Sequence, residues 1–276
     1  MHFSAEAVGL VPALALGYAV VARAARVDRA RVGFAAASLV LVFAAFATEL
    51  QPLALHTFLW AHLLQNVVLA EWAPALLVLA IPPSLGRRAA RFALFRPVVA
   101  LPVWLVTYFV WHLPWIYDYA LEHPHSLLHV EHLSYLVAGT ALWWPVVHGR
   151  SSSGAKALYL FLAFVLASPI GLLLALIPSP VYAFYEHAPR TWGPGPLFDQ
   201  QIAGMSMAFE QALVFFAVFT LYLFRFLRDE RVDPHVLDEL VSAGHGSAPS
   251  GVMSVRYAAR DAGFDARSNT EPGRPA

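Results

Sequence analysis

Residues 156–177 read KALYLFLAFVLASPIGLLLALI, 22 consecutive positions in which Lys156 carries the only charge. An α-helix needs ~20 predominantly apolar residues to cross the ~30 Å hydrocarbon layer of a membrane. Six further stretches have this character, so the sequence predicts seven spans, at residues 4–22, 33–50, 57–80, 97–117, 127–147, 156–177 and 201–224. We therefore predict an all-α, polytopic membrane protein folded as a seven-transmembrane-helix bundle.

The composition supports this fold class and limits the chemistry. Hydrophobic residues make up 59% of the chain and charged residues 13%, against about 45–50% and about 25% in soluble domains. The net charge of zero argues against a nucleic-acid partner. The chain has no cysteine, which excludes thiolate ligands, disulfide exchange and a cysteine nucleophile and leaves His, Met, Asp and Glu to carry any chemistry. The abundance of Ala, Val, Leu and Arg suggests a bacterial genome rich in G and C.

The basic residues fall almost entirely on one side of the predicted bundle. If the seven spans alternate in direction, Arg190 is the only one of the 18 Lys and Arg residues in a segment on the opposite side. Lys and Arg mark cytoplasmic loops, so we expect the N-terminus outside and the C-terminus inside. No basic residue precedes the first apolar stretch, which is therefore predicted to be a retained span. We assign residues 1–228 to the transmembrane domain and 229–276 to a disordered cytoplasmic tail.

The histidines are concentrated on the side that lacks basic residues. Imidazole is the commonest metal ligand among side chains, so this asymmetry predicts a metal site near the outer face. Nine of the twelve histidines lie on or just beneath that face: His2, His56, His62, His112, His123, His125, His129, His132 and His187.

Two of these histidines lie at the outer ends of predicted spans. Gln65 and Asn66 follow His62 by three and four residues, so one helical stripe offers an imidazole and two amides. The alternative is that these groups hydrogen-bond to neighbouring helices. His112 precedes Pro114, which ends the helix, so His112 is either a ligand or a cap on the carbonyls that the proline frees.

The fifth predicted span opens with a histidine stripe. His125, His129 and His132 follow the i, i+4, i+7 pattern, and the last two have the spacing that suits a shared ligand. Glu131 points about 100° away from His132 on a regular helix. We therefore expect it to be a hydrogen-bond partner or the counter-ion of a neighbour, not a co-ligand. His123 and His125 fall in a loop, where solvation is the simpler interpretation.

Two acidic residues are predicted near the middle of the membrane. A charged Glu71 or Glu210 there costs about 2.5–3.5 kcal/mol on insertion scales. Each is therefore part of a proton or cation path, or is a neutral, hydrogen-bonded acid. Met207 shares a face with Glu210, whereas Met205 points to the other side of the helix. Asp199 has the position of a helix cap.

Taken together, the motifs resemble those of the seven-helix CtaG-type family of cytochrome c oxidase assembly factors, over residues 50–226. The resemblance is carried by His62-x-x-Gln65, Ala73-Pro74-Ala-Leu-Leu-Val-Leu with Pro82, Trp111-His112-Leu-Pro114-x-x-Tyr117-Asp118, His129-x-Glu131-His132 with Trp143-Trp144-Pro145, and Asp199-Gln200-Gln201-x-Ala-Gly204.

The resemblance implies a multi-pass protein of the bacterial plasma membrane that helps to assemble a terminal oxidase by assisting copper to reach its copper centre. It also implies a second histidine four residues after the first, where this chain has Asn66, and an apolar residue where it has Glu210. The implied partners are the lipid bilayer, the oxidase subunits and extracytoplasmic copper chaperones.

We accordingly predict a non-enzymatic assembly factor that holds copper transiently through His62, His112, His129 and His132. The auxiliary residues of this hypothesis are Gln65, Asn66, Asp118, Glu131, Asp199, Gln200, Met207 and Glu210. Two alternatives stay open. Haem iron would be ligated axially by His112 and His132, and a metal or proton transporter would use Glu71 and Glu210.

Overall fold

The computed structural model describes residue 4 and residues 6–25 and 27–229, and no strand occurs among them. His2 and most of the predicted tail, residues 230–276, lie outside the described residues. The elements are η1 Glu6–Leu10, α1 Val11–Ala25, α2 Arg29–Ala47, α3 Leu50–His56, α4 Leu59–Val67, η2 Val68–Trp72, α5 Ala73–Ala80, α6 Pro83–Ala89, η3 Ala93–Phe95, α7 Pro97–Trp111, α8 Pro114–Glu122, α9 Leu127–Val147, α10 Ser153–Leu176, α11 Ala183–Glu186 and α12 Pro196–Asp229.

The predicted all-helical architecture is confirmed within the described residues, and the number of spans is confirmed in part. By length and composition, five helices can cross a membrane, and the bent pair α7 and α8 makes a sixth if it is counted as one span. These five cover residues 7–25, 29–47, 59–80, 153–176 and 196–228. The count of seven and the orientation of the ends stay predictions.

The predicted fifth span, α9, forms a helix but is not among these five. Polar side chains, which include Glu131 and His132, lower the mean hydropathy of this helix. Both residues are buried inside the bundle. The helix packs against α5, η2 and α7. A helix that buries much of its surface against other helices needs less hydropathy than one that faces lipid, because its polar side chains lie inside the bundle.

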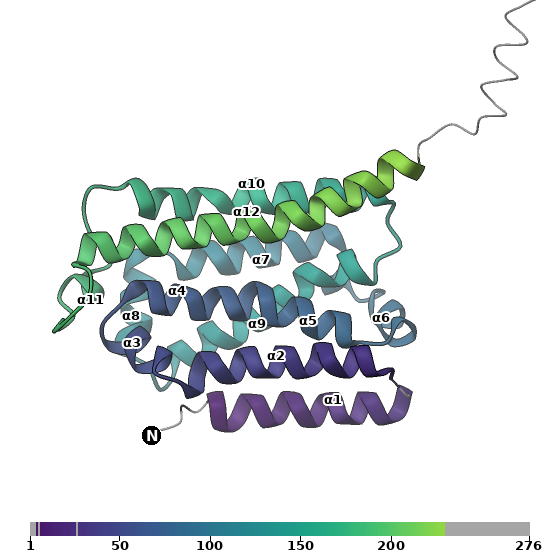
Figure 1. Cartoon of the computed structure of the whole chain (residues 1–276), viewed down its shortest axis with the longest axis horizontal. Coiled ribbons are helices and arrows are strands. Elements are labelled where there is room, and N and C mark those ends of the chain that lie inside the picture. Colours follow the sequence, from purple (N-terminus) through teal and green to yellow (C-terminus); the bar gives the residue numbers. More distant parts are fainter. Residues whose placement is uncertain (1–3, 5, 26, 230–276) are drawn as a thin grey trace, which may run out of the picture. The chain divides into compact units, whose positions relative to one another are not determined.

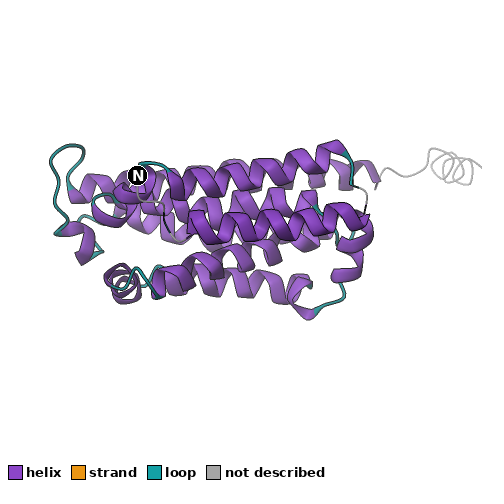
Figure 2. Cartoon of the chain, turned by 90° about the horizontal axis from the view of Figure 1, so that it is seen from below, coloured by secondary structure: helices purple, strands orange, loops and turns teal. Residues whose placement is uncertain are grey.

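The long helices lie side by side, as Figure 1 and the perpendicular view in Figure 2 show. In addition to the contacts of α9, α12 packs along α10 and against α4, and α2 packs against α5. The first helix, α1, lies at the edge of the bundle against α2 and contributes no buried residue. The core of the described chain is therefore built mainly by α4, α5, α7, α9 and the helices that flank them.

Two glycines allow the closest helix contacts. A Cβ atom on Gly139 of α9 would lie 2.2 Å from the carbonyl oxygen of Ala70. A Cβ atom on Gly204 of α12 would lie 2.6 Å from the carbonyl oxygen of Gly171 of α10. Small residues at such crossings let the backbones approach each other, which is the usual basis of helix association in membranes.

Two prolines coincide with breaks in the predicted spans. The span predicted at 97–117 is wrong in its course, because α7 ends at Trp111 and α8 starts at Pro114 with an axis bent by 72°. Leu113 is extended, as expected for a residue before proline. In the third span, the π-helix η2 precedes Pro74, where a regular helix would clash with the proline ring.

The bundle has two chemically different ends, which lie at opposite sides of Figure 1. We call the end formed by α3, α8 and α11 the histidine end. The other end, the arginine end, is formed by α6 and the C-terminal part of α12, and it carries Arg87, Arg88 and Arg225. The sequence prediction of separated histidine and arginine sides thus corresponds to the two ends of one bundle.

Candidate functional site

Four ionisable side chains are buried together beneath the histidine end. His62 lies on α4, His112 follows α7, and Glu131 and His132 lie on α9; their exposed fractions are 1%, 7%, 0% and 1%. We call these four residues the histidine cluster. The ring centroids of His62 and His132 are 6.2 Å apart, and Nε2 of His62 is 3.7 Å from Oε1 of Glu131.

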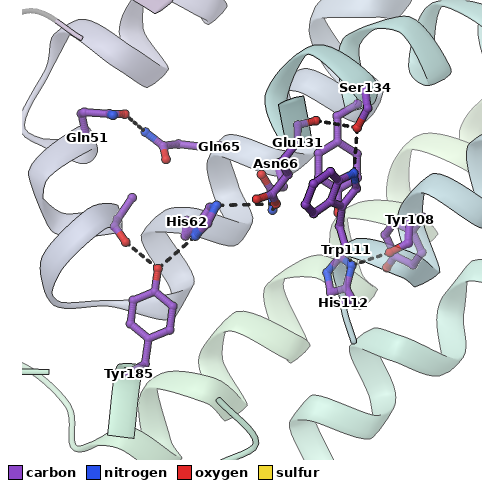
Figure 3. Close-up of polar contacts among 12 residues, drawn as sticks. Gln51, His62, Gln65, Asn66, Tyr108, Trp111, His112, Glu131, Ser134 and Tyr185 are labelled. Atoms are coloured by element: carbon purple, nitrogen blue, oxygen red, sulfur yellow. Dashed lines mark hydrogen bonds and ion pairs between the residues drawn. The ribbon is translucent and has the colours of Figure 1, made fainter. Parts of the chain in front are cut away.

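The ring of His62 is oriented by a tyrosine of α11, a helix distant in the sequence (Figure 3). Nδ1 of His62 is 3.0 Å from the hydroxyl of Tyr185, and this hydroxyl donates its only hydrogen to the carbonyl oxygen of Ala54. Burial raises the pKa of Tyr185 well above its usual value, so the hydroxyl keeps its proton. Nδ1 of His62 must therefore be the donor, and the lone pair of the neutral ring is at Nε2.

His112 also carries its ring hydrogen on Nδ1, for a different reason. Its Nδ1 lies 2.8 Å from the carbonyl oxygen of Tyr108, which can only accept, so Nδ1 carries the hydrogen. This bond confirms the capping role that Pro114 predicts, but it leaves Nε2 with a lone pair. Among the described residues, Nε2 of His62 and Nε2 of His112 are buried and have no hydrogen-bond partner.

Glu131 is held by Asn66, not by a histidine. Nδ2 of Asn66 donates to Oε1 of Glu131 over 2.9 Å, and Oε2 of Glu131 has no hydrogen-bond partner among the described residues. Oε1 of Glu131, which accepts from Asn66, also lies 3.7 Å from Nε2 of His62 on the neighbouring helix, so Glu131 is the hydrogen-bond partner of a neighbour. Asn66, which stands where the resemblance implies a second histidine, orients an acid in this chain.

The segment between α10 and α12 covers the cluster. The hydroxyl of Tyr182 donates to the carbonyl oxygen of His112, and Tyr185 contacts His62. Asp118 accepts from the backbone N–H groups of Ala183 and Phe184, over 3.1 and 3.2 Å, and so fixes the start of α11. Through these contacts the two buried tyrosines of the segment lie across the mouth of the bundle.

The aromatic lining of the cluster was not predicted from the sequence. The ring of Tyr117 lies 5.0 Å from that of His62 and 6.2 Å from that of His112, between centroids. Tyr135 approaches Nδ1 of His112 at 3.4 Å. The only available signal was the position of Tyr117 in the quoted motif and of Tyr135 one turn after His132.

Several predicted residues take other positions. His129 is half-buried in the first turn of α9, and His123 and His125 are exposed. Gln65 donates to Gln51 and to the carbonyl oxygen of Ala45. Asp199, Gln200 and Asp118 bind backbone groups of other segments, as described for Asp118 above. Met207 and Glu210 line a separate cavity between α4 and α12.

The cluster offers metal-binding groups without a preformed coordination shell. Among the described residues, no three His, Asp or Glu side chains converge closely enough to hold a metal ion as they stand. The unpartnered imidazole nitrogens and carboxylate oxygen nevertheless form a donor set that suits a transition metal. In metal sites a ligating histidine donates its other ring N–H to a carbonyl, carboxylate or similar acceptor, and His62 and His112 both have such an arrangement.

The chain was compared with known proteins. The family model described as cytochrome c oxidase caa3 assembly factor (Caa3_CtaG) matches residues 14–229, a longer segment than the resemblance over 50–226. No curated protein and no solved structure matches the chain.

Proposed function

The chain belongs to the cytochrome c oxidase caa3 assembly factor family, and from this premise we propose that it assists oxidase assembly by passing copper through the histidine cluster. In this proposal the chain is not an enzyme, and copper is its cargo. The family and the membrane-capable helices support a membrane protein. We further propose that it is a multi-pass protein of a bacterial plasma membrane with the histidine end outside, the N-terminus outside and the C-terminus in the cytoplasm.

The observation that carries the proposal is the direction of the two buried imidazoles. His62 and His112 both use Nδ1–H for a hydrogen bond within the protein and keep an unpartnered lone pair at Nε2. A buried polar atom without a partner costs free energy, roughly 1–3 kcal/mol for a neutral group. Two such imidazole atoms in one buried region are available to a ligand, which supports the proposal.

The chemistry of the cluster favours copper held for a short time. Imidazole suits copper and zinc, and the affinity of nitrogen sites rises toward copper in the divalent series. His62 and His132 are the closest imidazole pair, with Glu131 beside them and His112 behind Tyr117. His129, one turn before His132, would receive the ion near the surface. Because the ligands must move to close around an ion, binding should be reversible, as delivery to a partner requires.

The arginine end supports the proposed orientation. Arginines gather at α6 and at the end of α12, and cytoplasmic segments are the ones enriched in Lys and Arg. The histidine end would then face the side from which extracytoplasmic copper chaperones approach. The proposed partners are these chaperones and the oxidase subunits that receive the metal, within the lipid bilayer.

The test is oxidase assembly in cells whose own family member has been deleted. We expect the unmodified chain to restore copper-loaded oxidase, and His62→Ala and His132→Ala to restore less than one tenth as much at equal membrane levels of the chain. His123→Ala and His125→Ala, which remove exposed histidines outside the cluster, are matched controls and should restore fully. Full restoration by His62→Ala and His132→Ala together would refute the proposed role of the cluster.

A further inference from the structure

A second pair of ionisable groups, of which Glu71 is buried and Glu210 is half-buried, lies deeper in the bundle than the histidine cluster. Glu71 lies in the π-helix η2 and is 1% exposed, and Glu210 lies on α12. A π-helix inserts an extra residue per turn and is often found at functional sites. Here it carries an acidic side chain into the interior of a predicted span.

The two acids are joined by reciprocal hydrogen bonds. Gln211, which follows Glu210, donates to Oε1 of Glu71, and Trp72, which follows Glu71, donates to Oε1 of Glu210. Oε2 of each acid is buried and has no hydrogen-bond partner among the described residues. Because no donor reaches these two oxygens, a second negative charge on the pair would be uncompensated.

The surroundings supply hydrogen bonds but no positive charge. Nε2 of Gln211 donates to Oε1 of Glu71 over 3.1 Å and to the hydroxyl of Tyr108 over 3.1 Å. Nε1 of Trp72 donates to Oε1 of Glu210. Within residues 6–25 and 27–229 neither acid forms an ion pair with Lys, Arg or His. Tyr108, another titratable group, is linked to Glu71 through Gln211.

These neutral donors stabilise one negative charge and not two. Like charges close together in a medium of low dielectric do not both ionise, as the paired acids of aspartic proteases illustrate. Oε1 of each acid accepts from Gln211 or Trp72, and Oε2 of each acid has no donor among the described residues. The pair therefore keeps at least one proton.

A cavity gives the pair a route for exchange. A space of about 190 Å³ lies between α4 and α12, lined from Trp60 in the first turn of α4 to Glu210, with Ser206 along its wall. A cavity of this size accommodates water when polar groups are present. The lining thus joins the carboxyl of Glu210 to the histidine end of the helices.

We propose that Glu71 and Glu210 form a proton-binding site, separate from the histidine cluster, that exchanges one proton with water through the cavity between α4 and α12. Uptake of a proton from water in the cavity makes both acids neutral, and release returns this proton to water and leaves one carboxylate beside one neutral acid. The proposal does not depend on copper. It implies that the charge of the Glu71–Glu210 pair changes with pH.

The test is pH-difference infrared spectroscopy of the full chain in lipid vesicles. The unmodified chain should show a protonated carboxyl band at neutral pH that shifts in D2O and titrates in two steps. Glu71→Gln and Glu210→Gln, which keep size and hydrogen bonding, should each convert the two steps into one. Glu186→Gln, at an exposed position on α11, is the matched control and should retain both.

Three results would overturn the proposal: no protonated carboxyl band at neutral pH, a band that both variants retain, or a titration that follows sodium concentration and not pH. The D2O measurement uses the unmodified chain, so it tests the site even if a variant fails to fold. A Leu64→Trp substitution, which fills the cavity, should slow the D2O shift at least ten-fold. An unchanged rate would refute exchange through the cavity.

Discussion

Replacement of Asp199 by alanine should strongly destabilise the described part of the chain. Asp199 lies in the first turn of α12, but its carboxylate accepts from the backbone N–H groups of Leu59 and Trp60, over 2.9 and 3.1 Å, at the start of α4. It also pairs with Arg190 over 3.1 Å. The carboxylate is fully buried, so it links three segments that are distant in the sequence.

The size of the effect follows from these contacts. Loss of a helix cap costs about 1 kcal/mol, and removal of one partner of a buried ion pair costs roughly 3–5 kcal/mol. The same atoms serve both functions, so the two costs overlap and we expect a total of about 3–5 kcal/mol. Asp199→Asn keeps one acceptor oxygen and should lose about half as much.

The assay is the free energy of unfolding in mixed micelles, followed by titration with a denaturing detergent. Asp118→Ala is the matched control, because Asp118 also accepts from two backbone N–H groups but caps the four-residue helix α11 from a half-buried position. We expect it to lose only about 1 kcal/mol. Equal losses for Asp199→Ala and Asp118→Ala would refute the reasoning that burial and the link to α4 decide the size of the effect.

Three further predictions concern packing, tautomer and pH. Gly139→Ala should cost about 1–3 kcal/mol of unfolding free energy because its Cβ would overlap the backbone of η2, whereas Gly9→Ala, with open space around it, should cost little; equal losses would contradict the packing. Tyr185→Phe removes the acceptor for Nδ1 of His62 and should lower copper affinity about 10–100-fold in a competition titration. An unchanged affinity would contradict this role of Tyr185. The pKa of Asp28, outside the spans, is lowered chiefly by the backbone N–H of Arg31, which the Asp28 side chain caps. The charged carboxylate therefore contributes its full stability above the ordinary pKa of Asp, and this stability is lost as the pH falls through the lowered pKa. The melting temperature of Asp28→Asn should accordingly fall less in acid than that of the unmodified chain.

Hydropathy predicted the helical fold because a helix that crosses a lipid bilayer needs a long apolar stretch of sequence. The long apolar runs of α10 and α12 could be recognised as spans without knowing which helices pack beside them. The helix α9 was found as an apolar run with histidines at one end, yet its polar residues make it less apolar than a lipid-facing span. The bend at Pro114 was signalled by the proline, but its 72° angle depends on the packing of α8.

The candidate site was predictable only in its components. Helical spacing placed His62 and Asn66 on one stripe, but it did not say which acid that stripe would meet. The contact of Asn66 with Glu131 joins residues 65 positions apart, and that of His62 with Tyr185 joins residues 123 apart. Contacts of this kind arise from the packing of whole helices, so local patterns contain no information about them. The role of Asp199 at the start of α4 escaped prediction for the same reason.

The most direct measurement is the stoichiometry and affinity of Cu(I) binding to the purified full chain in lipid nanodiscs, by competition with a chromophoric chelator. We expect one ion per chain, with binding lost in His62→Ala, weakened in His112→Ala and unchanged in the combined His123→Ala and His125→Ala control. Binding that survives His62→Ala and His112→Ala together, or a chain that takes up no copper, would contradict the assignment of the histidine cluster as the copper site.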